Sequence, residues 1–517
     1  MLILVAILIS LVVPFAVLAI GRVRSQPGYQ WLLSVIAAGA VWVLVVLSRL
    51  KLPQEIMLIE WYPASWFQEF PALLLDQYSW PYALAIVTIS LAVLLTDAAR
   101  THELDANAWA ATLALSGLGL LSVLAGNPLT LLLTWAIMDL VEAWVLLERV
   151  TANRDRERVV ISFSVRVAGM VILVIAGLQT QTMGQVLRFT QIPPQVGGLL
   201  LLASGLRLGV LPPHQPFLKE PPLRRGLGTM IRLLPVAASL ILLTRTASVG
   251  IPTTWKPVII ALAIVTALYS TISWLQARDE LDGRPFWILG MGSLALLAAV
   301  QVLPQASLAW GLAILFSGSL LFLRSLRHRS LVFLPLASLF LITGLPLTPG
   351  AVGLQVYPTL GLLPMITMVF LHGILLAGYL KYSLQVQDEA AQIERWAWAV
   401  YPAGLVLLLL SHLGISIWTW VEQGIVLLQP GWWVSFLLIL LIGLLWWLST
   451  RRFEWPGWIG AGMQRLFSLN WAYAVFWWIY RVMTRLIGFV TRILEGEGGI
   501  LWALLLLMLL IAVIIGS

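Results

Sequence analysis

Hydrophobic runs of about twenty residues follow one another along the chain, from Leu2 to Ile515. A helix rises about 1.5 Å per residue, so each run is long enough to cross a hydrocarbon layer about 30 Å thick. The Ala, Leu and Val of these runs do not alternate with polar residues, as the strands of a membrane barrel would. The pattern predicts an all-α polytopic membrane protein with about fifteen or sixteen transmembrane helices.

We expect these spans near residues 2–20, 30–49, 80–98, 108–125, 128–147, 160–178, 196–211, 229–245, 256–275, 285–303, 306–323, 331–346, 358–380, 397–418, 431–449 and 499–516. The first span is apolar from its first residue and lacks the positive start of a secretory signal, so we expect it to be retained. The predicted divisions are the first three spans at 1–105, a core of two inverted repeats at 106–380 (spans 4–8 and 9–13), two further spans at 381–454, a lateral helix at 455–498 and an anchor span at 499–517.

Basic residues gather in the loops that follow odd-numbered spans. Cytoplasmic loops carry an excess of Lys and Arg, so these loops are predicted to be cytoplasmic and the N-terminus external, in the inner membrane of a prokaryote. The residues concerned are Arg22, Arg24, Arg149, Arg154, Arg156, Arg158, Lys219, Arg224, Arg225, Arg324, Arg327, Arg329, Arg451 and Arg452.

Proline interrupts two of the predicted spans. Span seven runs into Pro212 and Pro213, and span twelve runs into Pro346, Pro349 and Gly350. Proline removes a backbone donor and clashes with the preceding turn, so each helix must unwind there. Unwound backbone survives in a membrane only when it is packed in protein or lines a cavity. Spans seven and twelve run in opposite directions, as in an inverted repeat built around a transport site; two ordinary proline kinks are the alternative.

The segment that follows span fifteen differs from the spans. Arg481, Arg485 and Arg492 recur at spacings of four and seven beside an aromatic-rich stretch. This pattern predicts a basic amphipathic helix that lies along the cytoplasmic membrane surface or along a partner subunit. A further, weakly hydrophobic span is the alternative.

Composition and charge narrow the interpretation. Only 10% of the residues are charged, against about 25% in soluble globular proteins. The net charge of +8 comes from scattered arginines rather than a basic tract, so we expect contact with the lipid bilayer and none with nucleic acid. The chain has no cysteine, which excludes disulfides, thiolate metal sites and a cysteine nucleophile.

Signatures of soluble catalytic sites are missing from the sequence. No Gly-Lys-Ser/Thr phosphate loop occurs, and we expect no catalytic site, cofactor or metal in this chain. The acidic group at residues 278–282 would suit a divalent ion only with further ligands, so a solvated loop is the preferred interpretation.

Four charged residues fall within neighbouring spans. Asp139 and Glu142 lie three apart and share one face of span five, while Arg166 and Arg207 on spans six and seven are the expected partners. Buried charges are favoured when they neutralise one another. Two interpretations stay open: a displaced ion site in which a carboxylate titrates, and a static salt-bridge cluster.

Three histidines also fall in apolar surroundings. His214 follows the double proline, where it would either gate protons near its reference pKa of about 6.5 or satisfy a free carbonyl. For His372 and His412, hydrogen bonding between helices is the more typical role.

Several of these motifs resemble the antiporter-like membrane subunits of respiratory complex I and of Mrp-type cation/proton antiporters, over roughly residues 60–380. The segment from Gly126 to Met138 is similar to the fifth helix of that family, Arg207 to His214 to its seventh, and Gly344 to Gly353 to its twelfth. Asp76 and Arg166 also match family positions. The resemblance implies a fourteen-span core, a lateral helix and other membrane subunits of a multisubunit complex as partners.

In that family a Glu on helix five, a Lys on helix seven and further relay residues are implied to move protons. Here the Glu position is Ala136, the Lys is Arg207, and the eighth-helix His corresponds to Ile231 or Arg232. Three further Lys positions fall on Leu281, Gly318 and Leu354.

Arginine stays charged at pH values where a buried lysine can exchange its proton, so the relay is altered or lost. We therefore predict a membrane subunit of a complex-I-like or Mrp-like ion-translocating assembly. A structural subunit without transport and an unrelated transporter or lipid-handling enzyme are the alternatives.

Overall fold

The computed structural model describes residues 1–23, 27–58, 70–99, 105–150, 153–214, 225–386, 394–423 and 429–450, together with short pieces of residues 462–511. The chain divides into two compact units, Met1–Ala461 and Gly462–Ser517. The described pieces of the second unit, such as residues 481–486 and 503–508, are helical. Most of the predicted lateral helix and anchor span, including Arg492, lies outside the described residues.

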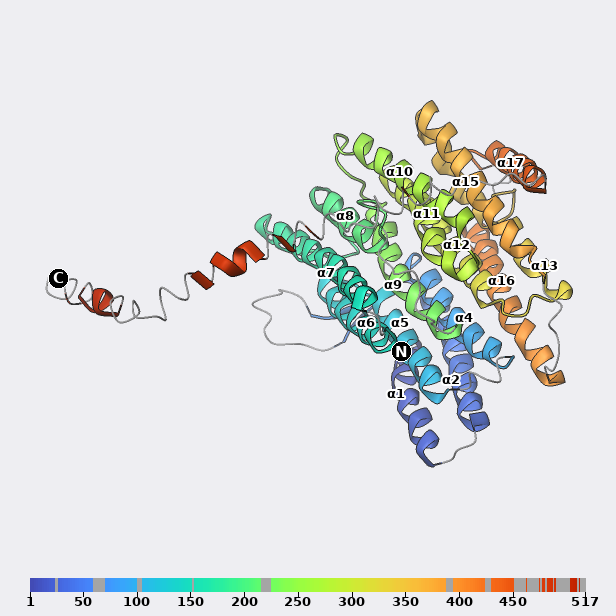
Figure 1. Ribbon diagram of the computed structural model, residues 1–517, viewed down its shortest axis with the longest axis horizontal. Helices are drawn as coiled ribbons and strands as arrows, with labels where there is room; N and C mark the ends of the chain where they lie inside the picture. Colours follow the sequence, from blue (N-terminus) through green and yellow to red (C-terminus); the bar gives the residue numbers. More distant parts are fainter. Residues whose placement is uncertain are drawn as a thin grey trace. The chain divides into compact units, whose positions relative to one another are not determined.

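The first unit is a bundle of apolar helices (Figure 1). Its first half contains α1 (Leu2–Val23), α2 (Pro27–Ser48), α4 (Ser79–Asp97), α5 (Ala106–Val123), α6 (Pro128–Arg149), α7 (Asn153–Thr182), α8 (Gly197–Leu208) and α9 (Arg225–Thr246). Its second half contains α10 (Lys256–Gln276), α11 (Glu280–Val300), α12 (Pro304–Leu323), α13 (Phe333–Ile342), α14 (Gly350–Gly353), α15 (Leu362–Ser383), α16 (Arg395–Gln423) and α17 (Trp433–Thr450).

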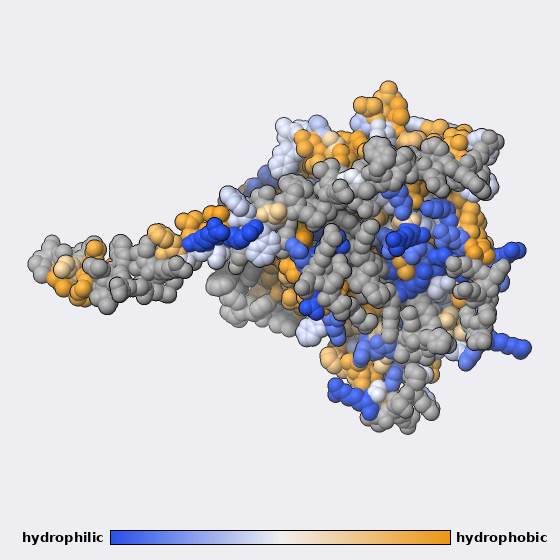
Figure 2. Space-filling view, in the orientation of Figure 1, coloured by the Kyte–Doolittle hydropathy of each residue, from blue (hydrophilic) through white to orange (hydrophobic). Residues whose placement is uncertain are grey.

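Among the described helices, 12 are long and apolar enough to cross a membrane. The helices α8 and α13 are shorter, with 12 and 10 residues, and the apolar part of α17, Trp433–Leu448, is also a shorter helix. Each of the first fifteen predicted spans overlaps one helix of the structure, and the all-α polytopic class is confirmed. On the face drawn in Figure 2, hydrophobic residues lie along the edge of this unit and hydrophilic residues gather over its middle.

Helix α9 joins the two halves of the bundle. It packs on α5, α6 and α8 on one side and on α11 and α12 on the other. Every residue in the most apolar 18-residue stretch of α9 is buried, and the same holds for α11 and α12. Helices with apolar residues all round are stable in this position because every face meets another helix.

A short β-hairpin, which the hydrophobic pattern does not predict, lies between α2 and α4. Strand β1 (Gln54–Met57) pairs antiparallel with β2 (Ala72–Leu75), with Gln54 opposite Leu75. The β2 strand also bonds to the turn between α5 and α6, through Leu74 N to Leu124 O (2.6 Å) and Gly126 N to Ala72 O (2.8 Å). The hairpin thereby fixes the start of α6.

The chain is interrupted near both predicted breaks. Helix α8 ends at Leu208, and Gly209 takes the left-handed conformation with φ +79°, a helix end that glycine favours. Helix α13 ends at Ile342, and after residues 343–349 the chain resumes as α14, which starts at Gly350, and the 3-10 helix η5 (Leu354–Thr359). A Cβ on Gly350 would lie 2.9 Å from the Ile342 carbonyl oxygen, so only glycine lets the chain fold back on α13.

Aromatic side chains fill the core of the second half. Trp274 of α10 contacts Trp287 of α11 (ring centroids 5.8 Å apart), and Trp287 contacts Tyr379 of α15 (5.2 Å). Trp310 of α12 donates its indole N–H to the Gly353 carbonyl of α14 (3.0 Å). These rings lock α10, α11, α12 and α15 together without any charged group.

We expect Gly353→Ala to destabilise the protein by about 1–3 kcal/mol, since overpacking a tight core forces side chains off their rotamers. A Cβ at Gly353 would lie 2.5 Å from the ring of Trp310. Gly443→Ala in α17 is the matched control, because nothing lies within 4 Å of its Cβ position. The measurement is the midpoint of thermal aggregation in detergent, and equal midpoints for the two variants would contradict this packing.

Candidate functional site

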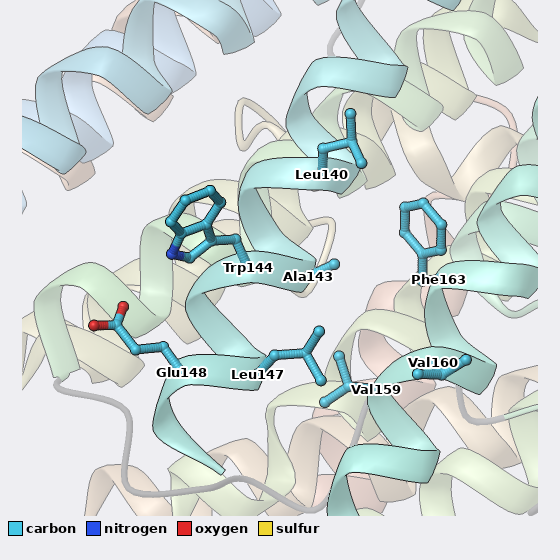
Figure 3. A pocket seen from close by; sticks show the side chains of 8 residues that line it. All are labelled: Leu140, Ala143, Trp144, Leu147, Glu148, Val159, Val160 and Phe163. Atoms are coloured by element: carbon cyan, nitrogen blue, oxygen red, sulfur yellow. The ribbon is translucent and has the colours of Figure 1, made fainter.

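Helix α6 directs two carboxylates into the bundle. Asn127 caps its N-terminus by accepting a hydrogen bond from Thr130 N (3.0 Å), and Pro128 starts the helix, both of which are favoured at these positions. One helical face, which includes Trp135, Asp139 and Glu142, is buried. The opposite face exposes Ile137, Leu140, Trp144 and Leu147. Figure 3 shows part of this outer face, where Leu147 of α6 lies beside Val159 of α7 and Trp144 points away from α7.

Asp139 forms a two-pronged ion pair with Arg207 of α8. The Arg207 Nη1 atom lies 2.6 Å from Asp139 Oδ2, and Nη2 lies 2.9 Å from Oδ1. Such parallel bonds between guanidinium and carboxylate are among the strongest polar contacts in proteins. Helix α8 is therefore tied to the middle of α6.

Glu142 forms a second pair of the same kind with Arg166 of α7, through both guanidinium Nη atoms. Arg166 also reaches Asp139 Oδ1 (3.5 Å), and Arg232 of α9 reaches Glu142 Oε1 (3.4 Å). The five residues Arg207, Asp139, Arg166, Glu142 and Arg232 thus alternate in sign from α8 to α9, and we name them the ion-pair chain.

The ion-pair chain is buried, since each of its residues is at most 3% exposed. Desolvating a charge costs several kcal/mol, which only close pairing of opposite charges offsets. Removing one member leaves its partner charged and unpaired, at a cost of about 3–5 kcal/mol. The four helices that supply these residues are consequently held in one relative arrangement.

Two neighbours fix the position of Arg207. Its guanidinium carbon lies 4.1 Å from the centroid of the Trp135 ring, a cation–π contact, and its Nη1 atom donates to the Arg166 carbonyl (3.3 Å). Gly169 of α7 makes room for the side chain, because a Cβ there would lie 2.7 Å from Arg207 Cγ. The arginine stem therefore lies flat against α7.

The structure gathers Asp139, Glu142, Arg166, Arg207 and Arg232, and it leaves His214 apart from them. His214 is buried, and its Nδ1 atom lies 2.7 Å from the Pro212 carbonyl oxygen. Among the described residues, no hydrogen bond or ion pair joins His214 to the ion-pair chain.

The proline residues lie at the interruptions rather than among the charges. Pro212 and Pro213 follow the end of α8. Pro346, Pro349 and Gly350 lie between α13 and α14, or at the start of α14.

Glu280 forms a third buried pairing that the sequence interpretation missed. The prediction of a solvated loop at 278–282 is wrong for this residue, which is 3% exposed. Asp279 caps α11, and Glu280 accepts from Arg225 (2.7 Å) and from Arg327 (2.8 Å). The sequence did contain a signal for a helix start here, because acidic residues are favoured at the N-cap and in the first turn of a helix.

Asp76 and Arg245 form a fourth pairing, beside the β-hairpin. Arg245 Nη1 lies 3.2 Å from Asp76 Oδ2, and Asp76 also caps α4 by accepting from Ser79 N (2.8 Å). Burial raises the pKa of the Tyr78 phenol, and the Asp76 charge raises it further. The phenol at this helix start therefore stays protonated.

Apart from Arg207, and from Arg232 in the second alignment of the eighth-helix His, the positions where the resemblance places relay residues hold no titratable side chain. Ala136 is half-buried, and Ile231 and Leu354 are fully buried aliphatic residues. At Gly318 a Cβ would lie 2.9 Å from Trp287 Nε1, so the indole occupies the space of a longer side chain. Proton exchange along the second half would need groups at other places.

We expect Asp139→Asn to lower the free energy of unfolding by about 3–5 kcal/mol, since it leaves Arg207 and Arg166 with an uncompensated buried charge. Asp139→Leu combined with Arg207→Met should recover most of this loss, because it removes both charges of the pair. Glu148→Gln is the control, as Glu148 is an exposed carboxylate on the same helix. Denaturant titration in detergent, followed by tryptophan fluorescence, measures these effects, and a double variant no more stable than Asp139→Asn would contradict the pairing.

No protein-family model matches the sequence, and no curated protein matches it. Three solved structures contain chains with a similar fold. The Mrp complex from Dietzia sp. DQ12-45-1b matches over 99% of this chain and 63% of that chain, with a TM-score of 0.73 and 15% identity. The membrane-bound sulfane sulfur reductase, an archaeal respiratory membrane complex, matches over 99% of both chains, with a TM-score of 0.69 and 12% identity.

Respiratory complex I from Thermus thermophilus with bound aureothin matches over 80% of this chain and 97% of that chain, with a TM-score of 0.58 and 15% identity. This chain therefore spans less than two thirds of the similar chain in the Mrp complex and nearly the full length of the other two. The protein therefore has the same fold as chains found in these three membrane complexes.

Proposed function

We propose that the protein is a membrane subunit of a multisubunit, ion-translocating assembly of the complex-I or Mrp kind, and that its own buried charges brace the fold instead of relaying protons. The match of 99% of the chain to subunits of two such complexes supports the first part. The ion-pair chain, with Arg207 in the place of a lysine, carries the second part.

A proton relay needs groups that change their charge during the cycle. Arginine does not, because its pKa is above about 12. Asp139 and Glu142 are each held between two guanidiniums. Each carboxylate therefore has two buried partners of opposite charge, and this close pairing offsets the cost of burying the charges. The ion-pair chain is thus suited to holding the four helices in place.

The packing of the second half supports the same role. Trp287 lies against Gly318, a position where the resemblance places a relay lysine, and Trp310 lies against Gly353, next to another such position at Leu354. Rings therefore fill the interior around these two positions. An interior packed in this way leaves little room for the water that a proton path through these positions requires.

The membrane setting and the partners follow from the same proposal. The exposed apolar residues of α1, α6, α7 and α17 suit lipid or the apolar helices of partner subunits. We place the N-terminus outside a prokaryotic inner membrane, on the distribution of basic residues. The lateral helix proposed for residues 455–498 would contact the partner subunits.

The first prediction of this proposal concerns assembly. An affinity-tagged chain, expressed in its native cell and extracted in mild detergent, should migrate on a native gel well above its own mass of 57.1 kDa, with other membrane proteins in stable amounts. Mass spectrometry of the band identifies those proteins. A chain that migrates alone in every mild detergent would contradict a role in an assembly and favour an independent transporter or enzyme.

The second prediction concerns ion flux. Proteoliposomes that hold the purified assembly should retain proton or sodium flux within about twofold when Asp139→Leu is combined with Arg207→Met, since a brace lowers stability and not the barrier to transport. Flux is normalised to the amount of intact assembly on a native gel, and Glu148→Gln serves as the control.

Loss of flux by tenfold or more in intact assembly would instead favour the alternative of a displaced ion site at Asp139 and Glu142. Glu142→Gln, normalised in the same way, tests the second carboxylate separately, because its loss leaves the Asp139–Arg207 pair in place.

A further inference from the structure

Helix α16 carries a polar stripe along an otherwise apolar sequence. His412, Ser416 and Thr419 follow at spacings of four and three, which place them on one helical face. His412 is 2% exposed and Ser416 is 7% exposed, and Thr419 is half-buried near the end of the helix. From His412 to Thr419 the stripe is about 10 Å long.

A small pocket follows this stripe. It lies between α16, the start of α12 and the interruption before α14, and its volume is about 30 Å³. Gln305, Pro349, Val352, His412, Ser416 and Thr419 are among the residues that line it. Only Gln305 and Thr419 are partly exposed among these six, so the pocket opens near the ends of α12 and α16. Its volume suits one or two water molecules.

The imidazole of His412 forms the inner end of this pocket. One face of the ring stacks on Phe316 of α12, with centroids 5.1 Å apart. The Nε2 atom is buried and has no hydrogen-bond partner among the described residues. A buried polar atom without a partner is costly, and ordered water is the usual remedy when the surroundings are polar enough.

Among the described residues, no hydrogen bond or ion pair joins this histidine to a charged side chain. Helices α12, α13 and α14 contain no charged residue, and α4 contains only Asp97 at its last position. The guanidinium of Arg49 stacks on Trp418, two residues from Ser416, with its carbon 4.4 Å from the ring centroid. Water in the pocket is therefore the group that can exchange a proton with the imidazole.

We propose that the pocket is a water-filled proton-access site for His412. Water enters beside Gln305 and Thr419, passes Ser416 and hydrogen-bonds to Nε2. The nitrogen accepts a proton from a hydronium ion, so that one N–H bond forms, one O–H bond breaks and a water molecule is left. The site lies in the second half of the bundle and uses none of the groups of the ion-pair chain.

Hydrogen–deuterium exchange at the imidazole C–H, read by mass spectrometry on the full chain across a pH series, tests the site. This exchange requires solvent at the ring, and its rate follows the protonation of the imidazole. His328 in the partly exposed loop after α12 is the fast control. His372 is the slow control, since Trp310 (5.0 Å) and Tyr357 enclose its ring.

We expect His412 to exchange at least about tenfold faster than His372, with a sigmoidal dependence on pH. A His412 rate equal to that of His372 at every pH would overturn the proposal.

Ser416→Leu, which fills the pocket, should slow His412 to the rate of His372 and leave His328 unchanged. Ile417→Leu on the lipid-facing side of α16 is its control, because Ile417 is 49% exposed. Unchanged exchange at His412 in Ser416→Leu would also contradict the proposal, and the wild-type comparison stands if that variant fails to fold.

Discussion

Each carboxylate buried in the described helices must have an arginine from another element as its partner. That constraint fixes α6, α7, α8 and α9 relative to one another, since Asp139 and Glu142 find their partners on three different helices. Helix α8 has only 12 residues and ends one residue after Arg207. Because so short a helix has few packing contacts, its position depends strongly on the ion pair between Arg207 and Asp139. The same rule holds at Glu280 between Arg225 and Arg327, and at Asp76 with Arg245.

The hydrophobic pattern of the sequence was sufficient to predict the membrane spans. A membrane requires long apolar helices, and few other structures produce apolar runs of that length. Helical periodicity also brought Asp139 and Glu142 to one face, with Arg166 and Arg207 as partners. The particular pairs could not be derived, since they depend on helix rotation and on contacts such as Arg207 against Gly169. The burial of Glu280 was missed because its partners lie 55 and 47 residues away along the chain. The β-hairpin was missed because its strands have four residues each.

The two halves of the core fill their interiors with different kinds of side chain. In the first half α6 carries Asp139 and Glu142 about one and two turns beyond Ala136, and arginines pair with both carboxylates. In the second half Trp287 and Trp310 lie against Gly318 and Gly353, and the volume is filled by rings. Both arrangements stabilise one packed state.

Two buried histidines of the second half show what decides whether such a group can work. His372 hydrogen-bonds to the Tyr357 hydroxyl (2.8 Å) and packs edge-on against Trp310, so its charged form would have no water beside it. His412 has the same side chain and similar burial, but its ring ends a mainly apolar pocket into which Gln305, Ser416 and Thr419 also extend, beside the interruption before α14. An imidazole exchanges protons only where water reaches it, and unwound backbone in a membrane is where such a pocket can form. In this chain the interruption at Pro349 therefore serves to bring water to His412 of α16. It does not serve to position a relay residue on the interrupted helix itself.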